Sequence, residues 1–295
     1  MRIMTRGIRL YLYLLTALVL GWLVLRAETV LGIAKSTEWP DLLGICGLYF
    51  LSHAFRMLRL ALLSLDQRRL IVSLIAAHSL TAFPSSFMPF KIGEILRLAG
   101  FFSVFTSRRR AFALWLVERF GDVVVIAVFI LGLYAFNIIV PASIRTVLIL
   151  FIIASSVGIL GMFATASVLV FLNRHLVLSS LSARGLLLLR ISYVLRQLEL
   201  DIRSAVEGRF VGLMLLSGII WSFEILALSL FIRRMSVGGA DFSSMFAAAL
   251  LASLPGTDFS NSNLFGYYQS LVLVILTLMF LWMAWIVHNR NSSRQ

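Results

Sequence analysis

Apolar runs long enough to cross a lipid bilayer recur along this chain of 295 residues. One helical crossing needs roughly 20 mostly apolar residues. Hydrophobic residues make up 60% of the chain and charged residues only 13%, whereas soluble domains have about half apolar and a quarter charged residues. We therefore expect an all-α, polytopic helical membrane protein in one integral membrane domain, residues 1–295. Six full spans are predicted, at about 8–26, 42–65, 112–136, 146–172, 210–232 and 264–288.

Two further stretches, about 70–107 and 242–262, are apolar but interrupted by proline. Proline removes a helix hydrogen bond and clashes with the preceding turn, so each stretch is expected to bend. Non-helical backbone at membrane depth is tolerated only where protein shelters it. Each stretch is predicted to be a re-entrant helical hairpin or a pair of short helices. The prolines concerned are Pro84, Pro89 and Pro255.

The net charge of +13 does not indicate a nucleic-acid-binding patch, because the arginines are scattered in the loops between the apolar runs. Cytoplasmic loops of membrane proteins carry an excess of basic residues. Arginine clusters on both sides of 70–107 therefore place both ends of that stretch in the cytoplasm. The same reasoning puts the N- and C-termini there, together with an amphipathic linker at about 173–209. We expect a multi-pass protein of a bacterial inner membrane.

The order of elements indicates an inverted-topology repeat. Each half, about 1–140 and 141–295, contains two spans, a broken hairpin and a further span, and the two halves begin on opposite sides. Inverted repeats are common in secondary transporters, where broken helices meet near the bilayer midplane to form the binding site. This pattern favours transport.

Ten ionisable side chains other than histidine are predicted at membrane depth, where charge is costly and is usually paired or functional. Helical spacing places Arg56 with Arg59, Glu94 with Arg97, and Glu118 with Asp122 on shared faces. The structural alternatives are snorkelling arginines, an intrahelical ion pair and an interfacial cluster. Glu224 lies mid-span, so a buried arginine or Lys91 is expected as its partner. The ten are Arg56, Arg59, Lys91, Arg97, Arg119, Glu94, Glu118, Asp122, Glu224 and Asp258.

Neither a catalytic motif nor a metal or cofactor site is predicted. The only cysteine is Cys46, and the four histidines lack the spacing of metal ligands. His53 and His78 are interpreted as core histidines. The chain contains no P-loop, nucleophile elbow or zinc-protease motif.

The segment PFKIGEILR, the basic turn SRRR, the segment LWLVERFGD and a late ASLPG together resemble the lysylphosphatidylglycerol synthase transmembrane-region family. The resemblance covers most of the chain. It aligns a G-E-x-x-R element with Gly93, Glu94 and Arg97, and an E-R-x-x-D element with Glu118, Arg119 and Asp122. The chain departs from the family after Pro255 and Gly256, because the glutamate expected there is absent and Asp258 stands nearby.

The resemblance implies lipid handling by a stand-alone member without the aminoacyl-transfer domain. The leading hypothesis is a flippase-like translocator of a lipid or polyprenyl-linked glycolipid, whose phosphate-bearing head group binds in a charged midplane cavity. The candidate substrate-binding residues are the ten ionisable residues together with Pro255 and Gly256. One alternative is a membrane-embedded transferase with a polyprenyl-phosphate-linked sugar donor. The other is a non-catalytic partner of a synthase or glycosyltransferase.

Overall fold

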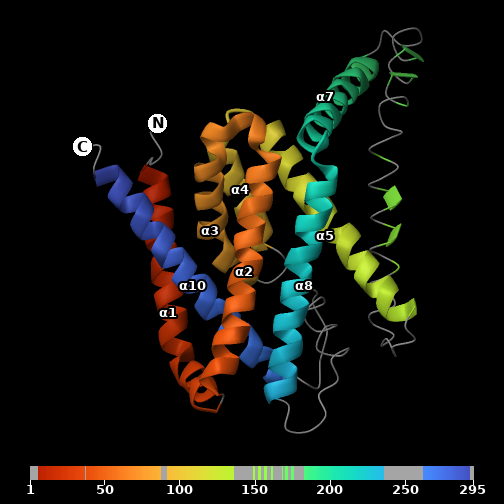
Figure 1. Ribbon diagram of the computed structural model, residues 1–295. Coiled ribbons are helices and arrows are strands. Elements are labelled where there is room, and N and C mark those ends of the chain that lie inside the picture. The colour runs from red at the N-terminus through yellow and green to blue at the C-terminus, as the bar shows by residue number, and fades with distance from the viewer. Residues whose placement is uncertain are drawn as a thin grey trace. The chain divides into compact units, whose positions relative to one another are not determined.

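The computed structural model describes residues 6–36, 38–87, 92–135, 183–235 and 262–292, together with isolated positions between 149 and 175. All regular structure within these residues is helical, and Figure 1 labels the main helices. The elements are α1 (Arg6–Ser36), α2 (Trp39–Leu63), the 3-10 helix η1 (Leu65–Leu70), α3 (Ile71–Phe87), α4 (Ile92–Val104), α5 (Arg108–Ala135), α7 (Ala183–Val206), α8 (Phe210–Met235) and α10 (Ser262–Ser292).

Three helices in the described part are long and apolar enough to cross a membrane: Trp39–Leu63, Phe210–Arg234 and Tyr268–Ile286. A shorter apolar segment, Tyr13–Leu25, lies inside α1. A helical membrane protein is therefore confirmed, since every element in the described part of the chain is a helix. The predicted span at 146–172 and the second hairpin at 242–262 lie wholly or mostly outside the described residues. The count of six spans and the inverted repeat stay predictions.

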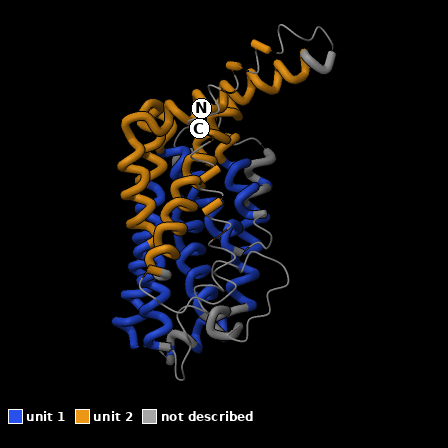
Figure 2. Tube along the Cα trace, turned by 90° about the vertical axis from the view of Figure 1, so that its right-hand side faces the viewer, with its two compact units in different colours: residues 1–57, 72–100, 222–295 blue, residues 58–71, 101–221 orange. Residues whose placement is uncertain are grey.

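The chain forms two compact units, which Figure 2 shows in different colours. Unit 1 contains residues 1–57, 72–100 and 222–295, and unit 2 contains residues 58–71 and 101–221. In unit 1, α1 packs against α10, and the rings of Trp22 in α1 and Phe83 in α3 meet edge to face at 5.7 Å. In unit 2, α5 packs against α7. Burial of such apolar side chains supplies the core of each unit.

The first broken stretch is a hairpin of two helices, so the predicted break is confirmed. Helix α3 ends at Phe87, three residues after Pro84, and α4 begins at Ile92. The two helices touch at Gly93, where an added Cβ would overlap the Cα of Ser85 and the carbonyl of Pro84. Glycine is needed here because two backbones approach this closely. Re-entry of the hairpin into the membrane stays a prediction.

Helices α2 and α8 run antiparallel, as contacts inside each unit show. In unit 1, Asp41 near the start of α2 pairs with Arg234 near the end of α8 at 3.1 Å. In unit 2, an added Cβ on Gly212 near the start of α8 would lie 2.8 Å from a methyl group of Leu62, near the end of α2. Polar residues lie between these two contacts along both helices, and they form the candidate site.

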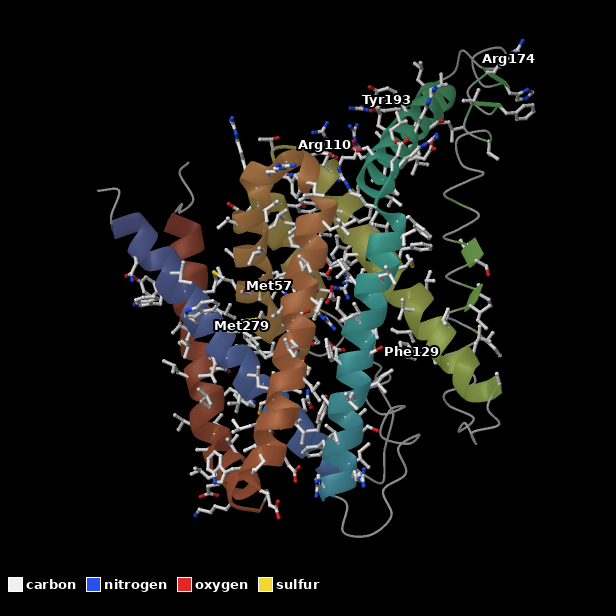
Figure 3. All side chains as sticks on the ribbon, in the orientation of Figure 1. Met57, Arg110, Phe129, Arg174, Tyr193 and Met279 are labelled. Carbon is white, nitrogen blue, oxygen red and sulfur yellow. The ribbon has the colours of Figure 1, made fainter. Side chains whose placement is uncertain are left out.

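The predicted amphipathic linker contains a helix, α7. Its residue Tyr193 is 60% exposed, and Figure 3 shows its position. The neighbouring Ser192 and the more distant Glu199 are buried. The amphipathic character predicted for this helix would suit an interface between water and lipid. Its placement at a cytoplasmic membrane surface stays a prediction.

Candidate functional site

In unit 2, Arg59 of α2 is completely buried and is held by two carboxylates of α5. Its Nη1 donates to Oδ1 of Asp122 at 2.6 Å, and its Nη2 donates to Oε1 of Glu118 at 2.8 Å. Nη1 also donates to the hydroxyl oxygen of Ser217 in α8 at 2.7 Å. The side chains of Arg59 and Glu118 are both 0% exposed. Charge-assisted hydrogen bonds of this kind are about twice as strong as neutral ones.

Two further side chains complete this group in unit 2, which we call the Arg59 cluster. Arg119 lies 3.3 Å from Oδ2 of Asp122, and Nε1 of Trp221 donates to Oδ1 of Asp122 at 3.3 Å. Two arginines face two carboxylates, so the cluster has no net charge. Balanced pairing is what allows ions to be buried. The cluster members are Arg59, Glu118, Arg119, Asp122, Ser217 and Trp221.

In unit 1, Arg56 of α2 forms an ion pair with Glu224 of α8. Their side chains are 14% and 16% exposed. The hydroxyl of Ser52, one turn earlier in α2, lies 3.2 Å from Oε1 of Glu224. The predicted arginine partner for Glu224 is therefore confirmed. Unlike Arg59, this arginine keeps part of its surface accessible.

The hairpin brings a second ion pair into unit 1. Arg97 and Glu94 of α4 lie 3.9 Å apart, and the hydroxyl of Ser85 in α3 donates to Oε1 of Glu94 at 2.8 Å. Arg97 is almost fully buried, at 3% exposed, whereas Glu94 is 20% exposed. The intrahelical pair, named from the sequence as the structural alternative for these residues, is present, and Ser85 links it across the hairpin.

Two buried histidines of unit 1, His53 and His78, contact each other. Nδ1 of His53 in α2 is 3.4 Å from Nε2 of His78 in α3, so one ring donates to the other. The charges of Arg56 and Arg97 both act on His53. We call this group in unit 1 the hairpin cluster. Its members are Ser52, His53, Arg56, His78, Ser85, Glu94, Arg97 and Glu224.

Helical periodicity explains why these side chains meet. In α8, Ser217, Trp221 and Glu224 are spaced by four and three residues and share one face. In α2, Ser52, Arg56 and Arg59 have the same spacing. Because α2 and α8 run antiparallel, the two polar stripes are brought together in opposite order. The serines and the tryptophan were not predicted as site residues, although this spacing marks them in the sequence.

The pairing of Glu118 and Asp122 on one helix face is confirmed, since both bind Arg59. The alternative that Arg59 snorkels toward water is wrong, because its side chain is completely buried in the protein. Four other predicted residues lie outside the described ranges: Lys91, Pro255, Gly256 and Asp258. Within the described residues, no group of three or more histidine, cysteine or acidic side chains is arranged to hold a metal ion.

Comparisons with known proteins agree with the sequence resemblance. The family model for the lysylphosphatidylglycerol synthase TM region matches residues 10–257. Neither the curated proteins nor the solved structures contain a significant match. The family match includes α2, the hairpin, α5 and α8, and therefore every described residue of both polar clusters. With most of its length matched, the chain belongs to the lysylphosphatidylglycerol synthase transmembrane-region family, which connects it with membrane lipids.

Proposed function

We propose that this protein translocates a lipid, or a polyprenyl-linked glycolipid, whose head group carries a phosphate. The observation that carries the proposal is the hairpin cluster, in which α2, α4 and α8 contribute two arginines and two carboxylates within unit 1. Charged side chains inside a membrane protein are costly, and where they occur they usually mark binding or transport sites. We place the protein in the inner membrane with both termini in the cytoplasm, as the arginine distribution favours.

Arg56 is the best-suited contact for a head-group phosphate. Arg56 pairs with Glu224, and both side chains keep some exposed surface. Arginine can bind phosphate through two parallel hydrogen bonds. A phosphate that approaches Arg56 competes with Glu224 for the same donors. When the head group leaves, Glu224 pairs with the arginine again, so Arg56 is not left as an unpaired buried charge.

The remaining predicted residues have different roles in this proposal. Arg97 of unit 1 is a further candidate contact for the head group, and Lys91 and Asp258 stay candidates outside the described residues. Glu94 orients Arg97, as Glu224 orients Arg56. Arg59 instead fixes Glu118 and Asp122, because its own donors are enclosed. Lipid tails stay in the bilayer while the polar group passes, which is the arrangement expected for broken helices in a transporter.

Reconstitution into liposomes with a fluorescent phosphatidylglycerol tests the proposal. A membrane-impermeant reductant bleaches the probe in the outer leaflet, and faster loss of the protected fraction reports translocation. We expect Arg56→Gln to lower the initial rate by about tenfold or more, since it removes a charge-assisted contact. The matched control is Arg234→Gln in α8, which removes an arginine whose side chain is 54% exposed from a similar pair with α2.

Translocation that is absent from the wild type for phosphatidylglycerol and for a polyprenyl-phosphate glycolipid would refute the proposal. Equal translocation rates for Arg56→Gln, Arg234→Gln and the wild type would show that the hairpin cluster does not bind the head group. The transferase alternative predicts a different result, namely a new product when the purified protein is incubated with a labelled polyprenyl-phosphate sugar donor. The partner alternative predicts activity only when a synthase or glycosyltransferase is present.

A further inference from the structure

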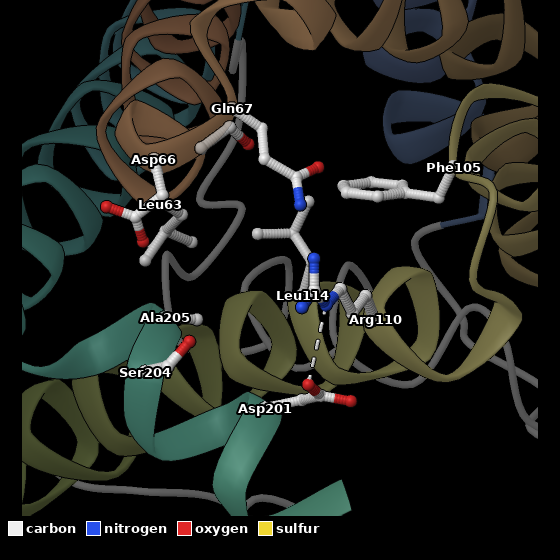
Figure 4. A pocket seen from close by; sticks show the side chains of 10 residues that line it. Leu63, Asp66, Gln67, Phe105, Arg110, Leu114, Asp201, Ser204 and Ala205 are labelled. Atoms are coloured by element: carbon white, nitrogen blue, oxygen red, sulfur yellow. Dashed lines mark ion pairs between the residues drawn. The ribbon is translucent and has the colours of Figure 1, made fainter.

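Unit 2 contains a cavity with both polar and apolar lining residues at the junction of η1, α5 and α7, and none of its lining residues belongs to the Arg59 cluster. Its volume is about 150 Å³. A single water needs only about 10–15 Å³ of such space, so the cavity accepts a larger group. Figure 4 shows Gln67 of η1 extending toward α5, and the ion pair between Arg110 and Asp201 at the opposite wall.

Basic side chains outnumber acidic ones in the ion pairs at this junction. Asp201 is shared by Arg109, whose Nε donates to it at 2.5 Å, and Arg110, whose Nε lies 3.6 Å away. Asp66 is bound by Arg209, and this hydrogen bond holds the pKa of Asp66 below its usual value. Both carboxylates are thus already occupied by arginines. Three arginines against two acids give the junction a net charge of about +1 when all five are ionised.

Hydrogen-bond donors are available on three sides of the cavity. The Arg110 side chain is 56% exposed, so the guanidinium has access to a ligand. Gln67 adds an amide and Ser204 a hydroxyl. Ser64 also lines the cavity and is only 5% exposed. Its hydroxyl oxygen has no hydrogen-bond partner in the described part of the chain. A buried polar group without a partner is uncommon and calls for an explanation such as a missing ligand.

We propose that this η1–α5–α7 cavity binds a phosphate anion through Arg110, Gln67, Ser204 and Ser64. A phosphate offers acceptor oxygens in several directions, which matches a cavity whose donors come from three elements. A cation is disfavoured because both carboxylates are already engaged. The phosphate belongs either to a lipid head group or to free phosphate. The inference depends on this cavity alone and does not require translocation.

Phosphorus NMR of purified full-length protein in an uncharged detergent tests the site. Line broadening of inorganic phosphate is followed in one titration, and that of dihexanoylphosphatidylglycerol below its micelle concentration in another, at constant ionic strength. We expect Arg110→Gln to weaken binding about tenfold. Ser64→Ala, a milder change, is expected to weaken it about two- to tenfold. The control is Arg108→Gln, which removes the same charge two residues away but does not line the cavity.

Binding that is retained in Arg108→Gln and weakened in both Arg110→Gln and Ser64→Ala supports the site. Tighter binding of the lipid than of inorganic phosphate then identifies a lipid head group as the source, and the opposite order identifies free phosphate. Equal losses in Arg108→Gln and Arg110→Gln would overturn the proposal, because they indicate a diffuse surface charge. Displacement of the probe by methylammonium, or no broadening with the wild type, would also overturn it.

Discussion

Replacing Arg59 with methionine should destabilise this protein strongly, because it leaves two buried carboxylates facing a single arginine. In the native cluster, two arginines balance Glu118 and Asp122. Methionine fills a similar volume but carries no charge. Arg119 remains, yet its side chain is 26% exposed and lies 3.9 Å from Glu118. It therefore cannot replace contacts of 2.6 and 2.8 Å made by a fully buried guanidinium.

The magnitude depends on which class of interaction applies. Removing one partner of a buried ion pair costs about 3–5 kcal/mol, whereas a typical polar contact between membrane helices contributes about 0.6 kcal/mol. The 0% exposure of both Arg59 and Glu118 places the pair in the first class. Each kcal/mol corresponds to about 2–4 °C in the midpoint of domains of 150–250 residues. The expected loss is therefore roughly 6–20 °C.

Thermal unfolding in detergent, followed by intrinsic tryptophan fluorescence, measures this shift, and Trp221 beside Asp122 is a local reporter. A compensating variant sharpens the test. Adding Glu118→Gln to Arg59→Met leaves Arg119 against Asp122, so the charges balance again and the double variant should be more stable than Arg59→Met alone. The reasoning is refuted if Arg59→Met melts no lower than the exposed Arg234→Gln, or if the second change lowers the midpoint further.

Three further results are expected. Gly93→Ala should separate the two helices of the hairpin and lower the unfolding midpoint. A Cβ added at Gly21 would have no atom within 4 Å, so Gly21→Ala should leave the free energy of unfolding unchanged or raise it by up to about 1 kcal/mol through helix propensity. Asp66→Asn should cost at most about 1 kcal/mol at pH 7, because this exposed carboxylate pairs with Arg209 at the surface. The folded-state pKa of Asp66 lies below its ordinary value of 3.8, so the ion pair stabilises the protein above that pH and its contribution is lost as the pH falls through the folded pKa. The melting midpoints of both proteins should therefore converge as the pH is lowered below 3.8. Trp221→Phe should cost about 1 kcal/mol through one lost hydrogen bond to a carboxylate, and an unchanged melting curve would contradict that contact.

Local features of the fold were predictable because they depend on neighbouring residues. Pro84 marks the end of α3 within three residues, and the spacing of Glu94 and Arg97 predicts their pair. Helix α1 instead continues to Ser36, well past the predicted end of its span at 26. The residues beyond that point include apolar ones and no proline, so nothing in them interrupts a helix.

Contacts between distant helices were predictable only as types of partner. Because Glu224 is predicted at membrane depth, it requires a basic partner at a similar depth, and the possible partners are then an arginine or Lys91. The choice of Arg56 depends on α2 and α8 being antiparallel neighbours, and no local pattern states this. Arg59 was likewise expected to contact a phosphate. Its enclosure by α5 follows from Gly121, where an added Cβ would lie 2.9 Å from the Ser217 hydroxyl, so α5 approaches α8 closely.

The tight contact at Gly93 also limits how the hairpin moves. With no clearance between Gly93 and the backbone of Pro84 and Ser85, α3 and α4 cannot roll or slide against each other without first separating. Packed elements of this kind respond as one rigid body, with bending confined to the residues at their ends. If the hairpin moves during transport, His78, Glu94 and Arg97 therefore move together with it and not independently of one another.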